Sequence, residues 1–129
     1  MANLLQFELV SPERMLASTE AEAVTIPGQM GDMTAMAHHA PFLTTLRPGY
    51  VTVTGTEAAR YFVTGGFAEI SENTVSVLAE EAVAEADVTA DWLGKKIEAA
   101  REAVAEAGDD RRQIEAQRLA DLEQISGRI

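Results

Sequence analysis

The sequence has no cysteine, few aromatic residues and few basic residues, and each shortage excludes a class of protein. With 0 cysteines in 129 residues, disulfide bonds, thiol catalysis and cysteine metal ligands are excluded. Only 10 basic side chains stand against 21 acidic ones, so the net charge of −11 argues against partners that are nucleic acid or anionic lipid. Aromatic residues make up only 5% of the chain, so aliphatic side chains and methionine must fill the core.

Long apolar runs are also missing, and none approaches the roughly 20 residues that a membrane-spanning helix needs. The N-terminus lacks a basic region followed by an apolar stretch, so we expect no signal peptide. The chain length is that of one domain, or of a small domain with an appendage. Residues 1–85 hold 11 acidic and 3 basic side chains, whereas residues 86–129 hold 10 and 7. A dense mixture of both signs is typical of solvated helices, which places the appendage at 86–129.

Residues 1–85 show the alternation of apolar and polar residues that predicts β-strands. Leu5, Phe7 and Leu9 alternate with Gln6 and Glu8, and similar runs recur up to about residue 81. Turn-forming residues separate these runs at Ser11-Pro12-Glu13, Pro27-Gly28, Pro48-Gly49, Gly55-Thr56-Glu57, Gly65-Gly66 and Glu72-Asn73. Short strands at this spacing predict an antiparallel β-sandwich or a flattened barrel.

From Val88 onward the period changes to that of a helix. A narrow apolar stripe is formed by Leu93, Ile97, Ala100 and Val104. We expect Thr89 or Asp87 to cap the start of this helix, and Gly108 to end it in the position that prefers glycine.

A second helix is predicted after Gly108, with Asp109 or Asp110 as its cap. Its apolar face is expected to be Ile114, Leu119, Leu122 and Ile125. Two amphipathic helices joined by so short a turn predict an antiparallel hairpin over residues 86–129.

The sequence contains no convincing set of catalytic or cofactor-binding residues. His38-His39 suggests a metal-dependent enzyme, but neighbouring residues of a strand point to opposite faces, and no further histidine or cysteine is present. We expect one imidazole to face solvent and the other to satisfy the backbone near Ala40-Pro41. Gly65-Gly66 lacks the lysine and hydroxyl residue of a phosphate loop and is predicted to be a hairpin turn or a bulge. We therefore predict a non-catalytic chain without a cofactor or metal.

One segment, punctuated by glycine and proline, is more specific than the rest. It reads Pro27-Gly28-Gln29-Met30-Gly31-Asp32, then His39-Ala40-Pro41-Phe42-Leu43, then Arg47-Pro48-Gly49. This pattern resembles the epsilon subunit of rotary ATP synthases, which is called delta in mitochondria. Residues 7–13, 24–28, 65–70 and 73–79 resemble the same family in the same order.

The resemblance implies a β-sandwich of about ten strands followed by a helical hairpin. It also implies a rotor subunit of the central stalk of a proton-translocating F-type ATP synthase, without catalysis of its own. The expected partners are the gamma subunit and the c-ring, with transient contacts to the alpha and beta subunits. The expected location is the cytoplasmic side of a bacterial inner membrane, as a peripheral part of the complex.

The family's motifs place the partner interface, with gamma or the c-ring, at Gly31, Asp32, His39, Ala40 and Pro41. Met30, Met33 and Phe42 are the apolar neighbours expected to supply most of the binding energy. Thr34 and Ala37 depart from the family's usual glycine and proline, so individual contacts are not transferred.

The hairpin of some relatives binds ATP or blocks ATP hydrolysis. Ala90 stands where the nucleotide motif has arginine, so we expect no strong ATP binding. Arg111, Arg112 and Arg118 are the candidates for an inhibitory contact, and whether the hairpin inhibits is left open. The alternative to the rotor role is a β-sandwich adaptor that binds an unrelated protein.

Overall fold

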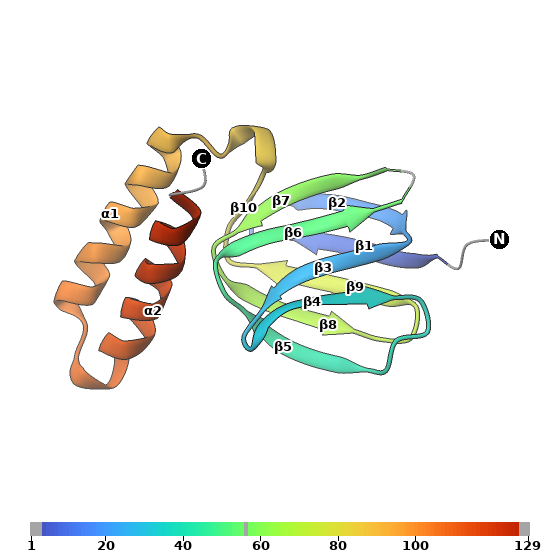
Figure 1. The fold of residues 1–129 in the computed structure, drawn as a ribbon, viewed down its shortest axis with the longest axis horizontal. Coiled ribbons are helices and arrows are strands. Elements are labelled where there is room, and N and C mark those ends of the chain that lie inside the picture. Colours follow the sequence, from blue (N-terminus) through green and yellow to red (C-terminus); the bar gives the residue numbers. More distant parts are fainter. Residues whose placement is uncertain (1–3, 56, 127–129) are drawn as a thin grey trace. The chain divides into compact units, whose positions relative to one another are not determined.

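The computed structural model describes residues 4–55 and 57–126. Internal contacts divide the chain into two compact units, Met1–Glu85 and Ala86–Ile129. The first unit contains the strands and the second the helical hairpin (Figure 1). No helix in the described ranges is long and apolar enough to cross a membrane.

The first unit is a sheet of ten strands folded into two layers. The strands are β1 (Leu5–Val10), β2 (Met15–Ala21), β3 (Ala23–Gly28), β4 (Gly31–Met36), β5 (Phe42–Leu46), β6 (Gly49–Thr54), β7 (Ala59–Val63), β8 (Gly66–Ile70), β9 (Thr74–Ala79) and β10 (Ala82–Ala84). A short 3-10 helix, η1 (Glu85–Asp87), follows.

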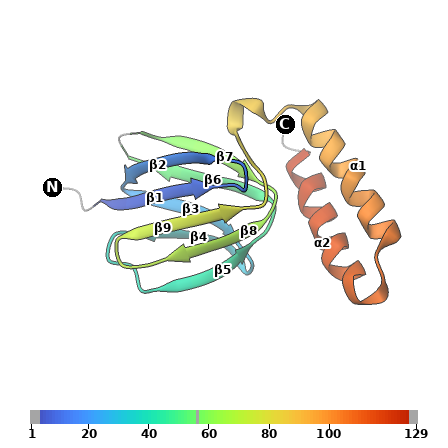
Figure 2. The ribbon, with the colours of Figure 1, turned by 180° about the vertical axis from the view of Figure 1, so that it is seen from behind.

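One layer holds β4, β3, β6, β7 and β10, and the other holds β5, β8, β9, β1 and β2 (Figures 1 and 2). The layers are continuous only through the pair Gly28 and Leu46, where β3 meets β5. All described pairings are antiparallel except that of β1 with β9. The predicted sandwich of about ten strands is confirmed, with one parallel pair within it.

Strand alternation creates the core between the layers. Phe7 and Leu9 are 0% exposed, and Leu5 is 2% exposed, whereas the intervening polar side chains face outward. Val51, Val53, Val75 and Val77 belong to the same cluster of buried residues. The period of two therefore places the inner face of each layer correctly.

The turn predicted at Pro27-Gly28 lies two residues later in the structure. Pro27 and Gly28 belong to β3, and the turn falls on Gln29 and Met30. Proline is tolerated because pairing of β3 with β6 ends at Thr25 and pairing with β5 begins at Gly28, so its missing N–H falls between the two.

Gly65-Gly66 is not a hairpin turn between paired strands, because β7 pairs with β6 and β10, whereas β8 pairs with β5 and β9. The two glycines carry the chain from one layer to the other. Gly66 has φ +134, and a Cβ atom there would lie 2.1 Å from the carbonyl oxygen of Leu78. Only glycine allows this approach of the two backbones.

The second unit consists of α1 (Ala90–Glu106) and α2 (Asp109–Ser126). Thr89 caps α1 by accepting a hydrogen bond from the Trp92 amide at 3.1 Å, which confirms one of the two predicted caps. Buried side chains on the hairpin include Leu93, Ile97, Ala100, Leu122 and Ile125.

Two details of the hairpin differ from the prediction. Ile114 is 61% exposed, so it does not belong to the buried face of α2. Gly108 does not have the positive φ of a glycine cap; Ala107 ends α1 in an extended conformation. The Gly108 carbonyl instead accepts hydrogen bonds from the amides of Arg111 and Arg112. Gly108, and not an aspartate, is therefore the N-cap residue of α2.

Candidate partner-binding surfaces

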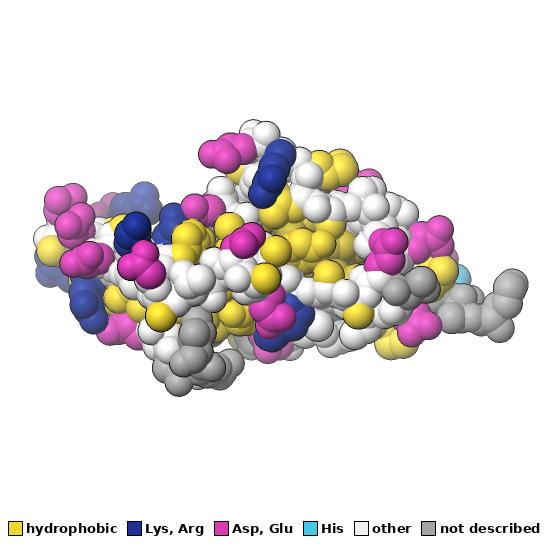
Figure 3. All heavy atoms as spheres, turned by 90° about the horizontal axis from the view of Figure 1, so that it is seen from above, with side chains coloured by type: hydrophobic (Ala, Val, Ile, Leu, Met, Phe, Trp, Pro, Cys, Tyr) yellow, Lys and Arg dark blue, Asp and Glu magenta, His cyan; other side chains and the backbone are white. Residues whose placement is uncertain are grey.

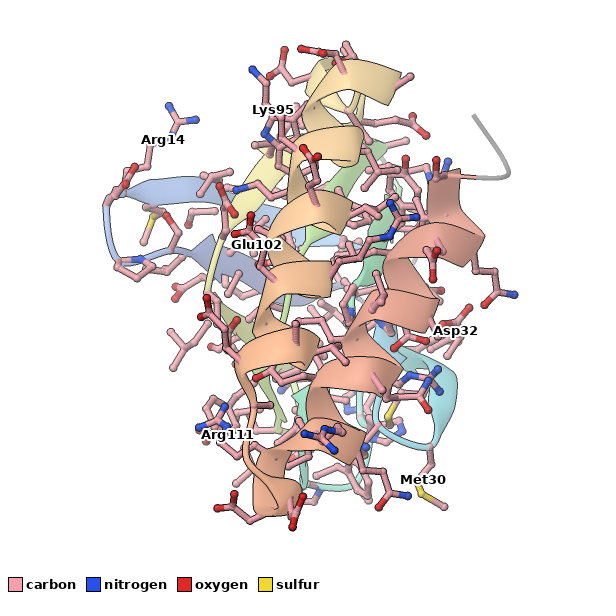
Figure 4. All side chains as sticks on the ribbon, turned by 90° about the vertical axis from the view of Figure 1, so that its left-hand side faces the viewer. Arg14, Met30, Asp32, Lys95, Glu102 and Arg111 are labelled. Carbon is pink, nitrogen blue, oxygen red and sulfur yellow. The ribbon has the colours of Figure 1, made fainter. Side chains whose placement is uncertain are left out.

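The turn between β3 and β4 presents the most exposed apolar side chain described. Met30 is 98% exposed at the tip of this turn, and Asp32 follows it as the second residue of β4 (Figure 4). Gly31 between them has φ +126, a conformation that favours glycine. Met33 points to the other side of β4 and packs partly against the core, so it offers less surface than Met30.

Contacts to β5 hold this turn in place. The Gln29 amide donates to the Thr44 hydroxyl at 3.4 Å, and the Thr45 hydroxyl donates to the Gln29 side-chain oxygen at 3.0 Å. The Arg47 amide donates to the Pro27 carbonyl at 2.9 Å. Met30 and Asp32 are therefore presented by an anchored turn, which lowers the entropy cost of binding a partner there.

His39, Ala40 and Pro41 lie in the connection between β4 and β5. His39 Nδ1 lies 2.7 Å from the Ala40 carbonyl oxygen, and His38 Nδ1 lies 3.6 Å from a Glu72 carboxylate oxygen. One imidazole thus satisfies the loop backbone, as predicted, and the other faces an exposed carboxylate. The described residues contain no group of three or more His, Cys, Asp or Glu placed to hold a metal ion.

The two parts of the predicted interface lie at opposite ends of β4. Asp32 is the second residue of β4 and His39 lies three residues after the end of the strand, so four strand residues, 33–36, stand between them. At about 3.3 Å per residue, the strand from Asp32 to Met36 spans roughly 13 Å. The sequence motif treats them as one region, but the structure presents two separate surfaces, with Phe42 belonging to the His39 end.

A third surface was missed by the sequence reasoning. In the second layer, β8, β9, β1 and β2 lie side by side (Figure 2). On the outer face of this layer, Phe67 lies opposite Leu78, Leu78 lies opposite Val10, and Val10 lies opposite Met15. Phe67 is 53% exposed, Leu78 57% and Met15 56%. We call Phe67, Leu78, Val10 and Met15 the apolar row. It crosses β8, β9, β1 and β2 without interruption by a polar residue.

Carboxylates flank the apolar row. A shallow hollow of about 280 Å³ is lined by Glu8, Val10, Leu43, Phe67, Glu69, Ser76, Val77 and Leu78. Glu8 and Glu69 are its only charged described lining residues, so an apolar surface with basic groups at its margin would complement it. The sequence did contain a signal for this surface, because some outward positions of the predicted strands hold apolar residues. In β9, for example, Leu78 occupies the same outward face as Ser76.

A groove opens on the side of the sandwich where β2 and β7 face one another without pairing (Figure 3). Its volume is about 270 Å³, and its lining includes Phe7, Leu16, Ala17 and Tyr61. The Thr19 hydroxyl bridges this side by donating to Glu57 at 2.7 Å. Glu57 is the one charged side chain in the described lining.

The predicted basic residues of the hairpin lie on α2 and are engaged within it. Arg111 donates to Glu115 at 3.1 Å, and Arg112 donates to the Ala107 carbonyl at 3.3 Å while lying 3.8 Å from Asp109. Arg118 is half-buried. Across the hairpin, Arg101 pairs with Glu123 at 3.3 Å. The guanidinium groups of Arg111 and Arg112 are thus paired locally in this conformation.

Comparison with known proteins identifies the family of the chain. Residues 4–85 match the model of the ATP synthase delta/epsilon chain β-sandwich domain. The ATP synthase epsilon chain of Mesorhizobium japonicum is 47% identical and covers 100% of this chain and 98% of that protein. The epsilon chain of Ruegeria sp. is 50% identical, covering 97% and 96%.

Solved structures share the fold at lower identity. A chain of the Euglena gracilis mitochondrial ATP synthase has a TM-score of 0.75 at 22% identity, covering 97% of this chain and 81% of that chain. The protein therefore belongs to the ATP synthase delta/epsilon family. The chains of this family are non-catalytic subunits of the ATP synthase complex. The resemblance inferred from the sequence is confirmed, and the alternative of an unrelated adaptor is wrong.

Proposed function

We propose that the chain couples the rotation of a gamma subunit to that of the c-ring, on the cytoplasmic side of a bacterial inner membrane. Its relatives are epsilon chains of bacterial ATP synthases, and one fold neighbour comes from an assembly of F1 with a c-ring. The observation that carries the proposal is the presence of two different exposed surfaces on one rigid sandwich. A coupling subunit needs one surface for each partner.

We assign the c-ring to the turn that carries Met30, Gly31 and Asp32. This turn is narrow, anchored to β5 and acidic, as suits contact with the short polar loops of a ring. Asp32 at the rim contributes about 0–1 kcal/mol through an exposed ion pair. Full burial of Met30 contributes more, about 1.5–3 kcal/mol.

The gamma subunit is assigned to the apolar row and to the adjoining His39 end. Leu43, 67% exposed, lines the same hollow as Phe67 and Leu78, so the apolar surface extends onto β5, whose start adjoins the His39 end. Covering the exposed half of Phe67 and of Leu78 stabilises a complex by about 1 kcal/mol each. The larger apolar area makes this the tighter of the two contacts.

Asp32→Lys in the assembled enzyme tests the assignment to the ring. We expect ATP-driven proton pumping to fall severalfold, while the affinity for the gamma subunit stays within about twofold of wild type. Glu20→Lys is the matched control, because Glu20 is an exposed carboxylate on β2. Equal pumping by the two variants would contradict the assignment, and a chain that fails to bind a gamma subunit would contradict the coupling role itself.

A further inference from the structure

Arg60 on β7 joins two side chains far from it in the sequence. Its guanidinium carbon lies 4.1 Å from the centre of the Tyr50 ring, and it donates a hydrogen bond to the Glu85 carboxylate. Tyr50 in turn meets the Phe62 ring edge-on, with centroids 5.4 Å apart. Both Arg60 and Glu85 are about half exposed, at 44% and 48% of their side-chain area.

The strand register explains why these groups meet. Tyr61 pairs with Ala84, Phe62 with Val83 and Val63 with Ala82, so the next pair in this antiparallel register would be Arg60 and Glu85. The backbone pairing stops at Ala84, and Glu85 begins η1. The Arg60–Glu85 contact therefore extends the pairing of β7 with β10 by one side-chain pair. Tyr50, on β6, lies diagonally across from Arg60, within reach of a long side chain.

The contact lies where the sandwich gives way to the hairpin. Strand β10 has only three residues, and β7 is its only described partner. The chain before β10 is held by bonds from Glu80 N–H to Gly65 and from Thr64 N–H to Glu81. After β10 come the single turn of η1, then Val88, and then the Thr89 cap of α1. Residues 86–88 lie between these two fixed points.

We propose that Arg60 sets the position of the hinge between the two units by holding Glu85 against β7. With the contact intact, backbone rotation is confined to residues 86–88. When it is lost, β10 separates from β7 and the hinge extends back to Glu81. Arg60 is thus a positioning residue: by holding Glu85, it limits how far the hairpin can move. A hinge of a few residues at the end of an element is the usual means by which packed units change orientation.

Amide hydrogen exchange on the isolated full-length chain tests the proposal without any ATP synthase partner. Arg60→Gln and Glu85→Gln are each expected to speed exchange of the Val83 amide about threefold, because a three-residue edge strand loses the half-exposed ion pair at its end. Arg14→Gln is the matched control: Arg14 projects from the turn between β1 and β2 (Figure 4), and its loss should leave β10 unchanged. Unchanged exchange in both Arg60→Gln and Glu85→Gln would overturn the proposal.

A charge swap and a ring deletion distinguish the effect of the ion pair from general destabilisation. The charge swap Arg60→Glu with Glu85→Arg should restore most of the protection of β10, whereas Arg60→Glu alone should not. Tyr50→Leu removes the ring and keeps the ion pair, so it should speed exchange only about twofold. A swap no better protected than the single variant would contradict the role of the pair.

The position of the hinge has a second readout. Because the chain has no cysteine, Glu20→Cys and Glu102→Cys provide one spin-label site on each unit. Arg60→Gln should broaden the distribution of label-to-label distances, and the charge swap should narrow it again. A distribution of the same width in all three proteins would show that Arg60 does not restrain the hairpin.

Discussion

Phe67 and Leu78 are direct cross-strand partners on β8 and β9, and both side chains are more than half exposed on the outer face of the sheet. Aromatic and aliphatic side chains paired in this way usually lie in a core. Their exposure, next to Val10 and Met15, supports the proposal that a partner subunit covers this area. The carboxylates of Glu8 and Glu69 set the charge that this partner must complement.

Replacing both residues should weaken binding without unfolding the sandwich. For Phe67→Ser with Leu78→Ser we expect a loss of about 2 kcal/mol in affinity for a gamma subunit, or roughly 30-fold, measured by calorimetry. The free energy of unfolding should change by only about 0.5 kcal/mol per site, since both side chains are exposed. Met36→Ser is the control, because Met36 is 59% exposed but lies on β4. An affinity no lower than that of Met36→Ser would contradict the assignment.

Two glycine substitutions should have opposite effects on stability. Gly66→Ala forces a Cβ atom toward the Leu78 carbonyl in a backbone conformation that alanine rarely adopts, so we expect destabilisation by about 3 kcal/mol. Gly94 lies within α1 with open space around it, so Gly94→Ala should stabilise the helix by up to about 1 kcal/mol. Urea unfolding followed by circular dichroism measures both. A tolerated Gly66→Ala would show that the two backbones can separate at this point.

The cap of α1 gives a local prediction. Thr89→Ala removes the acceptor of the Trp92 amide and should destabilise the start of the helix by about 1 kcal/mol, whereas Thr89→Ser retains the hydroxyl. Exchange of the Trp92 amide should rise about fivefold in the alanine variant only. Because the chain has one tryptophan, its fluorescence also reports on this end of the helix. Equal exchange in the two variants would contradict the capping role.

The hairpin is expected to be neither a nucleotide sensor nor a strong inhibitor. Ala90 stands where the family's nucleotide motif has arginine, so calorimetry should detect no saturable ATP binding with sub-millimolar affinity. Arg111 and Arg112 lie close to the carboxylates of Glu115 and Asp109 on the same helix, which weakens the attraction of these two arginines for an acidic partner. Removing residues 88–129 should therefore leave the ATPase rate of the complex within about twofold. A large rise on truncation would show that the hairpin inhibits hydrolysis.

The sequence predicted burial and helix capping correctly where they depend on the position of a residue within its own strand or helix. Phe7 and Leu9 are buried because period-two alternation places them on one face of a strand with no polar group to satisfy. Thr89 caps α1 because its hydroxyl accepts a hydrogen bond from an amide that has no partner within the helix. Ile114 was misplaced because a period of 3.6 fits several faces of so polar a helix, and packing against α1 selects only one.

The sequence by itself determined the strands, the helical hairpin and the family, because alternation, helical period and turn residues are local properties of the chain. Tertiary structure alone decided which surfaces exist. The apolar row is assembled from β8, β9, β1 and β2 by pairings between residues as distant as Val10 and Leu78. The pairing of β7 with β10 likewise brings Arg60 to Glu85, 25 residues later in the chain. Register across strands is set by packing of the whole sheet, so no local pattern could specify these neighbours.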